Sequence, residues 1–516
     1  MFRPRPTSPC RDPLNPLSPG TSSHSRSTVP RTGKTARAPR ARVLDCATEP
    51  GLKHPPRDQG RPVTVRLQLS EIPRTISTVP SPLRSASTPQ DPLSISPTLS
   101  RRKRGRAPWI VAWLLVGASP ADATDGPDED ERPDSLVLIV ADDLGTDRVG
   151  CYGDAAARTP HIDQLAAEGT RYETCWGAPL CTPARAMILT GLFPYRTGIG
   201  GKMKPSDTFD LSLPSLADVA ADHRARLIGK WHLTHDPQAP GLLGFEHRGS
   251  MKNLAQNETY WRWWKNVDGS LQPSFRYATT DNVDDAIRSL DRDVVVLMFN
   301  APHAPFHVPP PHLHTQATPG TDSRRFRAMV EAMDTEIGRL MAAIDALPDR
   351  RPLVIFTSDN GTPSAVHEPG DNQFRMKGTH YEGGLRVPLI ARGPGVPAGV
   401  VDRRLTSVVD FFATAQDVLN APGPSAADSV SIFADVPRRW IYTETFRPNG
   451  VGGPHKWRVQ SIRESRYKLI RRRKPNTIEH VLYDLLTDTD ESFNLLDGPL
   501  TSEQQAVYQQ LLAWLP

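Results

Sequence analysis

Three short apolar segments, each followed directly by polar residues, constrain the fold of this 516-residue chain more than any other feature. The segments and the polar residues that follow them are 136–141 with Asp142-Asp143, 294–299 with Asn300 and His303, and 353–356 with Asp359-Asn360. Continuous apolar runs of this length are typical of strands that a sheet buries on both faces. The pattern therefore predicts parallel strands whose polar residues gather at one edge.

Helical patterns lie between these segments. Thr159-Pro160 predicts a helix start and Gly169 its end, because Thr favours the N-cap, Pro the first helical position and Gly the position past the end. From Arg324 to about Leu347, apolar residues recur at three- and four-residue spacing, which predicts a long amphipathic helix. Strands that alternate with helices predict an α/β domain with parallel strands, in which ligands bind at the carboxyl ends of the strands.

Two of the strand ends carry hard oxygen ligands. Asp142, Asp143, Asp359 and Asn360 offer carboxylate and amide oxygens, which suit Ca²⁺ or Mg²⁺ better than Zn²⁺. Either motif alone is also a common turn after a strand. Since both occur at ends that a parallel sheet brings together, we expect a divalent metal site there, with Ca²⁺ as the first choice and Mg²⁺ as the alternative.

The segment around Cys181 combines a thiol with features that favour an anion. Thr182 is the predicted N-cap of a short helix and Pro183 its first residue, and Gly191 closes it. Cys181 thus lies just before a helix N-terminus, where backbone N–H groups and the helix dipole favour negative charge. Arg185 adds a positive charge one turn later, so the segment is suited to a tetrahedral oxyanion.

The sequence Cys181-Thr182-Pro183-Ala184-Arg185, with Thr190-Gly191 downstream, resembles the signature of the formylglycine-dependent, arylsulfatase-like sulfatase family of the alkaline phosphatase superfamily. Five further segments agree with that family in order along the chain. They contain Asp142-Asp143, Gly229-Lys230-Trp231-His232, Pro302-His303-Ala304-Pro305, Ser358-Asp359-Asn360-Gly361, and the segment 377–388 that begins with Lys377. The resemblance implies hydrolysis of a sulfate ester.

The resemblance also implies how the nucleophile is made. Cys181 would be oxidised after translation to formylglycine by a formylglycine-generating enzyme, and one hydroxyl of the aldehyde hydrate would attack sulfur. A divalent cation beside it would lower the pKa of that hydroxyl. The implied metal ligands are Asp142, Asp143, residue 181, Asp359 and Asn360.

The remaining motif residues would act on the sulfuryl group and on protons. Lys230, Arg185 and Lys377 would spread the charge of the sulfuryl oxygens in the transition state. His303, or Lys377 beside it, would protonate the leaving alcohol, and Lys230, His303 and Lys377 would bind the substrate. By resemblance, His232 would then take a proton from the second hydroxyl, which expels sulfate and restores the aldehyde.

The resemblance extends from about Leu136 to the C-terminus and implies a large mixed sheet sandwiched by helices, followed by a smaller C-terminal α+β subdomain. We place the catalytic domain at residues 124–420 and the subdomain at 421–516. In the second part, residues 440–443, 457–462, 467–471 and 480–483 alternate like short antiparallel strands, and 502–515 have a helical pattern.

The first hundred residues differ in composition from the rest. They contain 18 of the 52 prolines and a single aromatic residue, Phe2, and residues 1–106 hold 20 basic and 6 acidic residues. Such a stretch cannot bury enough apolar surface to offset chain entropy. We expect residues 1–98 to be disordered and interpret them as an untranslated leader. A nucleic-acid-binding tail is the less favoured alternative, because no aromatic residues interleave with the basic ones.

Residues 99–123 have the order of a secretory signal peptide. The basic residues 101–106 precede an apolar run at 107–118 and a small-residue cleavage site that ends at Ala123. The apolar run is too short for a stable membrane span. We therefore expect a periplasmic or secreted protein of residues 124–516, which has 42 basic and 50 acidic residues and no reason to bind nucleic acid.

Several questions stay open at the level of sequence. Cys151 and Cys175 are either a bridge or two buried thiols, with packing thiols favoured. The aromatic cluster Trp261, Trp263 and Trp264 could be core or a wall for stacking sugars. Two rival functions also remain: a phosphate or phosphonate ester hydrolase of the same superfamily, and an inactive relative that binds sulfated glycans. The leaving group and the oligomeric state cannot be predicted.

Overall fold

The computed structural model describes residues 132–220, 224–254, 259–316, 320–423 and 426–516. The predicted leader 1–98 and the signal peptide 99–123 lie outside the described residues. Among the described helices, none combines the length and the apolar character needed to cross a bilayer.

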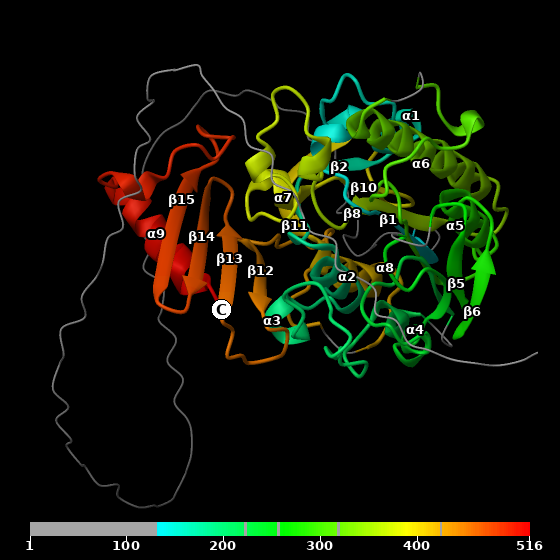
Figure 1. The fold of residues 1–516 in the computed structure, drawn as a ribbon, viewed down its shortest axis with the longest axis horizontal. Helices are drawn as coiled ribbons and strands as arrows, with labels where there is room; N and C mark the ends of the chain where they lie inside the picture. Colours follow the sequence, from blue (N-terminus) through cyan, green and yellow to red (C-terminus); the bar gives the residue numbers. More distant parts are fainter. Residues whose placement is uncertain (1–131, 221–223, 255–258, 317–319, 424–425) are drawn as a thin grey trace, which may run out of the picture. The chain divides into compact units, whose positions relative to one another are not determined.

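An eleven-stranded mixed sheet forms the centre of the larger part of the fold (Figure 1). Ten strands follow the order β11-β2-β10-β8-β1-β7-β3-β4-β5-β6, and β9 pairs with β2. Their bounds are β1 Ser135–Ala141, β2 Thr170–Trp176, β3 Ala225–Gly229, β4 Glu246–Gly249, β5 Trp263–Val267, β6 Ser270–Ser274, β7 Val294–Met298, β8 Pro352–Ser358, β9 Arg386–Val387, β10 Leu389–Arg392 and β11 Val400–Ser407.

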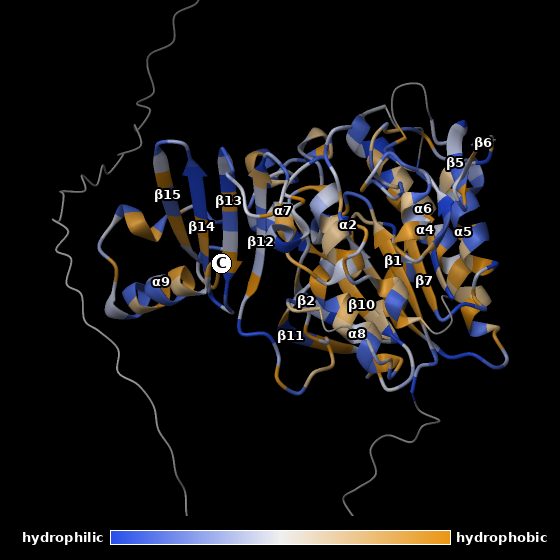
Figure 2. Ribbon diagram, turned by 90° about the horizontal axis from the view of Figure 1, so that it is seen from below, coloured by the Kyte–Doolittle hydropathy of each residue, from blue (hydrophilic) through white to orange (hydrophobic). Residues whose placement is uncertain are grey.

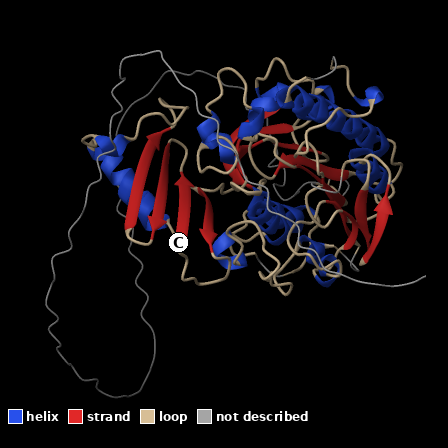
Figure 3. Ribbon diagram, viewed as in Figure 1, coloured by secondary structure: helices blue, strands red, loops and turns tan. Residues whose placement is uncertain are grey.

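Helices cover both faces of this sheet. The helices are α1 Pro160–Ala167, α2 Cys181–Thr190, α3 Pro194–Thr197, α4 Ala239–Leu242, α5 Ala278–Ile287, α6 Asp322–Asp345, α7 Glu382–Leu385 and α8 Phe411–Val418. Apolar residues of α1, α5 and α6 form a core on one face, and those of α2 and α8 form a separate core on the other. Figure 3 shows the helices on either side of the strands. The predicted α/β sandwich is confirmed.

The central strands carry the pattern that predicted them. β1 lies between β7 and β8 and runs parallel to both, and all three are buried along their length. Successive side chains of a strand point to opposite faces, so an apolar residue at every position feeds both cores. Figure 2 shows β1, β7 and β10 as the hydrophobic centre of the fold.

A second sheet of four antiparallel strands, in the order β12-β13-β14-β15, comes from the C-terminal part of the chain. Its strands are β12 Ile441–Arg447, β13 Trp457–Arg463, β14 Tyr467–Lys474 and β15 Thr477–Asp484, and helix α9 spans Ser502–Trp514. Leu511 of α9 packs on Ile462, Leu469 and Leu482 in one core cluster. The small antiparallel sheet with its helix is therefore confirmed.

One predicted helix boundary is wrong. Helix α2 begins at Cys181 with Leu180 as its N-cap, so Thr182 is already inside the first turn and does not cap it. Pro183 is compatible with this start, because the first N–H groups of a helix have no intrahelical partner and a proline there removes no hydrogen bond. Gly191 closes the helix in the left-handed conformation, with φ 66°, as expected.

Candidate active site

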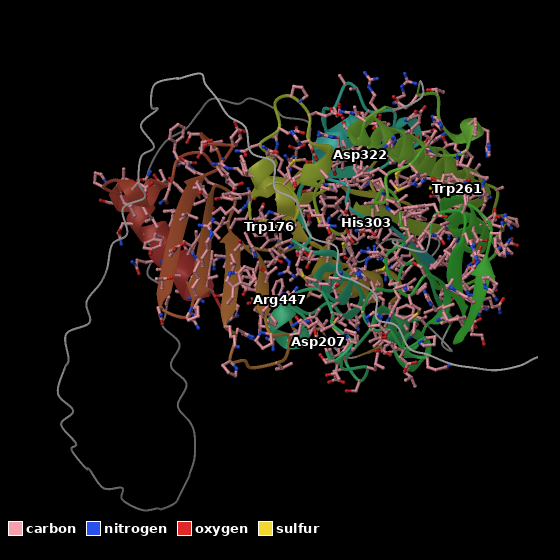
Figure 4. The ribbon with its side chains drawn as sticks, in the orientation of Figure 1. Trp176, Asp207, Trp261, His303, Asp322 and Arg447 are labelled. Atoms are coloured by element: carbon pink, nitrogen blue, oxygen red, sulfur yellow. The ribbon has the colours of Figure 1, made fainter. Side chains whose placement is uncertain are left out.

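Parallel pairing of β1 with β7 and β8 brings the predicted polar residues to one edge of the sheet. Backbone hydrogen bonds continue past the strand ends: Asp142 N–H donates to the Ala301 carbonyl at 3.0 Å and Asp359 N–H donates to the Ala141 carbonyl at 3.2 Å. The three polar segments predicted from sequence therefore meet. Figure 4 labels His303, which follows β7, near the middle of the larger part of the fold.

Asp143 is the centre of this site. Its Oδ1 accepts hydrogen bonds from Asn360 Nδ2 at 2.8 Å and from the Lys377 ammonium, and lies 3.6 Å from Cys181 Sγ. Its Oδ2 lies 3.8 Å from His303 Nε2. The structure thus brings together residues from five separate segments that sequence analysis selected.

Two of the five described non-glycine residues with positive φ lie at this site. Asp143 and His232 have φ values of 76° and 62°, which residues other than glycine adopt only at a cost of about 1–3 kcal/mol. Gly229, with φ 86°, ends β3 so close to β7 that a Cβ would lie 2.0 Å from the Met298 carbonyl oxygen. Only glycine fits this turn, and it directs Lys230 to the sheet edge.

A buried ion cluster lies beneath Asp143. Arg185 is fully buried and donates to the Lys230 carbonyl at 2.6 Å, to the Phe299 carbonyl at 3.4 Å and to Asp359 Oδ2 at 3.2 Å. The Lys230 ammonium pairs with Asp142, whose carboxylate also lies 3.6 Å from Arg185. Because these bonds join three strand ends and α2, Arg185 fixes their positions relative to one another.

Lys377 faces Cys181 across the site. Its ammonium lies 3.2 Å from Cys181 Sγ. The segment that carries it is held at two backbone points: Lys377 N–H donates to the Thr362 carbonyl at 3.0 Å, and Gly378 N–H donates to the Pro179 carbonyl at 2.9 Å. The second bond ties the lysine segment to the chain that enters α2.

The Cys181 thiol is not poised to be a thiolate. Burial and the neighbouring Asp142 carboxylate raise its pKa well above the ordinary value, and the opposing effect of Lys230 and Lys377 is smaller. Only the thiolate is a strong nucleophile. The thiol of Cys181 is therefore protonated and a weak nucleophile in this environment.

Both predicted histidines are neutral. Burial and the charge of Lys230 lower the pKa of His232 well below its usual value, and its buried Nδ1 has no partner among the described residues. Burial also lowers the pKa of His303. His303 Nδ1 lies 2.7 Å from the Ala304 carbonyl and so carries the proton, which leaves Nε2, 3.3 Å from Asn253 Nδ2, as an acceptor.

The donor set fits a divalent metal. Ligand atoms of Asp142, Asp143, Cys181 and His303 all lie within 4.8 Å of one another. Two further oxygens, Asp142 Oδ1 and Asn360 Oδ1, are buried and lack a hydrogen-bond partner among the described residues. A buried polar atom without a partner is costly unless a ligand satisfies it. Both carboxylate oxygens of Asp359, in contrast, have hydrogen-bond partners: Arg185 donates to Oδ2 and the Asp143 N–H donates to Oδ1.

Sequence analysis missed two residues beside His303. Tyr260 is buried, and its hydroxyl donates to the Asn300 carbonyl at 2.5 Å and to the His303 carbonyl at 2.8 Å. Asn253 contacts His303 Nε2. The sequence feature that could have indicated Tyr260 is its position next to the tryptophan cluster. No sequence feature indicated Asn253.

The tryptophan cluster is divided between core and surface. Trp263 is buried, whereas Trp261 and Trp264 are 39% and 52% exposed. The Trp261 ring lies 4.8 Å from the His307 ring, which itself packs on Tyr260. Cys151 and Cys175 are free thiols; Cys175 is buried, as expected of a packing residue, whereas Cys151 is only half-buried.

Comparison with known proteins agrees with this geometry. The family model described as "Sulfatase" matches residues 134–421. The pig (Sus scrofa) N-acetylgalactosamine-6-sulfatase is 30% identical over 371 residues, which cover 62% of this chain and 68% of the relative. Human arylsulfatase A is 30% identical over 437 residues, which cover 71% of this chain and 84% of the relative. This chain thus spans about two thirds of the first relative.

Solved structures share the fold. BT4656, in complex with its substrate D-glucosamine-2-N,6-O-disulfate, superposes with a TM-score of 0.60 at 22% identity and covers 74% of this chain and 97% of that one. Ps i-CgsB also superposes with a TM-score of 0.60, at 23% identity, and covers 74% of this chain and 91% of that one.

Proposed function

The chain belongs to the sulfatase family and is a sulfuric ester hydrolase, and we propose that it cleaves the sulfate ester of a sulfated carbohydrate by means of formylglycine at position 181. The observation that carries the proposal is the position of Cys181, whose Sγ lies 3.6 Å from Asp143 and 3.2 Å from Lys377. A nucleophile at this position has a carboxylate on one side and an ammonium on the other.

The raised pKa of the Cys181 thiol supports conversion of this residue. A neutral, buried thiol is a weak nucleophile at neutral pH. Formylglycine would supply an aldehyde hydrate, one hydroxyl of which can attack sulfur while the other can later lose a proton. The neutral His232, with its unpartnered Nδ1, is suited to accept that second proton.

A divalent metal would lower the pKa of the attacking hydroxyl. Asp142, Asp143, Asn360 and residue 181 would hold it, with Asp359 or His303 as a further ligand. The oxygens without partners on Asp142 and Asn360 support this assignment. Their hard character favours Ca²⁺, with Mg²⁺ as the alternative.

The cationic side chains would bind the sulfate group. Lys377 lies closest to Cys181, so we assign to it the contact with the sulfuryl oxygens during transfer. Lys230 pairs with Asp142 in the structure and would share that role. Arg185 is a positioning residue, because it is fully buried and its guanidinium bonds to two carbonyls and Asp359. Lys377 would protonate the leaving alcohol, because the neutral His303 has its proton on Nδ1, toward the Ala304 carbonyl.

Two comparisons support a carbohydrate as the leaving group. The pig relative is named for N-acetylgalactosamine 6-sulfate, and the structural neighbour BT4656 was solved with a disulfated glucosamine. A pocket for a sugar needs apolar surface for stacking. Trp261 offers an exposed ring, joined to His303 through His307 and Tyr260.

The experiment is production of the chain together with a formylglycine-generating enzyme, followed by peptide mass measurement and a sulfate-release assay. We expect formylglycine at position 181 and release of sulfate from sulfated N-acetylhexosamines. Cys181→Ala should abolish release without unfolding the protein. Cys175→Ala is the matched control, because it removes another buried thiol and should leave turnover unchanged.

Two results would contradict the proposal. An intact thiol at position 181 in protein that nevertheless releases sulfate would remove the formylglycine step. Faster hydrolysis of phosphate or phosphonate esters than of sulfate esters would shift the substrate to the rival class.

A further inference from the structure

Three arginines lie side by side on one face of the C-terminal sheet. In the antiparallel pair β13–β14, Arg458 is directly opposite Arg473, and Gln460 is directly opposite Arg471. Cross-strand partners and residues two apart on a strand point to the same face. Arg458, Arg471 and Arg473 therefore share one face, and Figure 2 shows the corresponding stretches of β13 and β14 as hydrophilic.

This arrangement brings like charges close together, and only Arg473, which is exposed, is well screened by solvent. Like charges directly opposite each other on neighbouring strands destabilise a sheet. Arg458 has one acidic partner, the buried Glu444, at 2.5 Å. Arg471 donates only to the neutral Gln460, at 2.9 Å and 2.5 Å. For Arg473, no side-chain hydrogen bond or ion pair exists within the described part of the chain. Such violations of local rules are expected at functional sites.

The pKa of Arg471 agrees with this excess of positive charge. Burial lowers it most and the charge of Arg473 lowers it next, whereas the smaller effects of Tyr442, which raises it, and of Arg458, which lowers it, oppose each other. Among the described residues, Glu444 is the acidic side chain that pairs with one of these three arginines, Arg458, and the carboxyl of Pro516, which accepts a hydrogen bond from Gln460 Nε2 at 3.2 Å, adds negative charge beside them. The repulsion among the three guanidinium groups is therefore only partly offset. An incoming anion would remove this repulsion.

A pocket opens beside these arginines. It has a volume of about 460 Å³, and its lining includes Arg458, Arg473, Tyr195, His455 and Pro516. The C-terminal residue of the chain is marked in Figure 1 beside the small sheet. The pocket borders the glycine-rich segment 450–453, and the His455 ring packs on Phe446 at 4.1 Å.

We propose that Arg458, Arg471 and Arg473 form a second anion-binding site, which holds a sulfate group of a sulfated polysaccharide outside the catalytic centre. Guanidinium groups match the geometry of oxyanions and bind them through paired N–H donors. The open side of the pocket, which includes Tyr195, would admit a saccharide chain. The choice of a sulfated glycan over other polyanions rests on the proposed function, whereas the anion site itself rests on the arginines.

The test compares two neighbouring arginines that point to opposite faces. Arg473→Gln removes a charge from the proposed site. Arg472→Gln is the matched control: it removes the same charge from the next residue, whose guanidinium donates to the Tyr381 hydroxyl on the other face. Both changes would be made in a Cys181→Ala chain, so that binding of sulfated oligosaccharides by calorimetry is measured without turnover.

We expect Arg473→Gln to weaken binding of a sulfated oligosaccharide about tenfold, the size of one charge-assisted hydrogen bond, and Arg472→Gln to change it less than about twofold. The chemically desulfated oligosaccharide should not distinguish the variants. Equal losses in the two variants would overturn the proposal, because they would show general charge attraction. The assignment of a sulfated glycan as the ligand would be refuted if inorganic sulfate bound as tightly as the oligosaccharide. Equally tight binding of single-stranded DNA would refute it as well.

Turnover separates this proposal from the proposed function. This second test uses enzyme in which Cys181 is kept and converted to formylglycine. In that enzyme, Arg473→Gln should leave kcat and KM for a small aryl sulfate unchanged and raise KM for a sulfated polymer. A wild-type protein that hydrolyses no sulfate ester would refute the proposed function, yet the binding difference between the two arginine variants would still test the anion site.

Discussion

His380 connects the C-terminal sheet to the segment that carries Lys377, and its replacement should affect both stability and catalysis. The imidazole is buried, with Nδ1 2.7 Å from the Ser461 hydroxyl on β13 and Nε2 2.8 Å from the Thr445 hydroxyl on β12. Burial, together with Lys468 and Arg472, lowers its pKa well below the usual value. The neutral ring therefore donates to one hydroxyl and accepts from the other.

The expected loss of stability follows from the two hydrogen bonds of His380. A buried hydroxyl left without its partner costs about 1–3 kcal/mol. We therefore expect His380→Ala to lower the free energy of unfolding by about 2–6 kcal/mol. An asparagine amide can replace Nδ1 and a glutamine amide Nε2. His380→Asn should accordingly keep the bond to Ser461, and His380→Gln the bond to Thr445, each with a loss of about 1–3 kcal/mol.

Activity should follow stability, because Lys377 is three residues from His380. A shift of the lysine by about 1 Å can cost up to about 100-fold in rate. We expect kcat to fall most in His380→Ala and less in the Asn and Gln variants. Denaturant unfolding and sulfate release, measured on the same preparations, give the two quantities. His367→Ala is the control, since this exposed histidine precedes Lys377 in the same loop and should change stability by less than about 0.5 kcal/mol.

One outcome would refute this reasoning. If His380→Ala loses the expected stability but keeps kcat and KM, the sheet stabilises the fold without positioning Lys377.

Four further predictions test other parts of the site and its surroundings. Arg185→Met should lower the free energy of unfolding by about 3–5 kcal/mol, because it leaves buried carboxylates uncompensated; the exposed Arg324→Met should not. Burial alone would raise the pKa of Glu382, but Lys468 and Arg463 lower it to about 2. Its folded pKa lies below the unfolded value of about 4.3, so its stabilisation is present above that pH and is lost as the pH falls towards 2. Glu382→Gln should therefore flatten the pH dependence of unfolding in this window. Chelation of Ca²⁺ should abolish sulfate release and re-addition should restore it, whereas full activity in chelator would exclude the metal. N-terminal sequencing of exported protein should begin at residue 124, and a retained segment 99–123 would exclude cleavage after Ala123.

The parts of the fold that sequence predicted are those with local signals. β1, β7 and β8 are continuous apolar runs, and α6 has an unbroken amphipathic repeat, so their type follows from side-chain periodicity. Helix boundaries are less predictable. Proline is tolerated at several positions of the first turn, so Pro183 does not determine which residue begins α2, and the helix starts at Cys181. The residues that meet at Asp143 were predictable because each follows a strand or belongs to a motif.

The supporting residues were not predictable, since their function depends on distant partners. His380 is separated from Ser461 by 81 residues and from Thr445 by 65. Tyr260 reaches the His303 carbonyl across 43 residues. A buried histidine or tyrosine has no sequence pattern that names its partner. Only the packing of the C-terminal sheet against the segment 376–385 shows that His380 joins the segment of Lys377 to that sheet.

Successive side chains of β14 point to opposite faces of the C-terminal sheet, and the two faces have different neighbours. Lys468 and Arg472 point to one face, where they bond to Glu382 and Tyr381 beside the Lys377 segment. Arg471 and Arg473 point to the other, where Glu444 is the acid that pairs with the neighbouring Arg458. In Figure 4, Trp176, whose Nε1 donates to Glu382, lies between His303 and this sheet. Consecutive arginines in the sequence therefore face different surroundings: Arg472 donates to the Tyr381 hydroxyl outside the proposed anion site, and loss of Arg473 should weaken only capture of the anion.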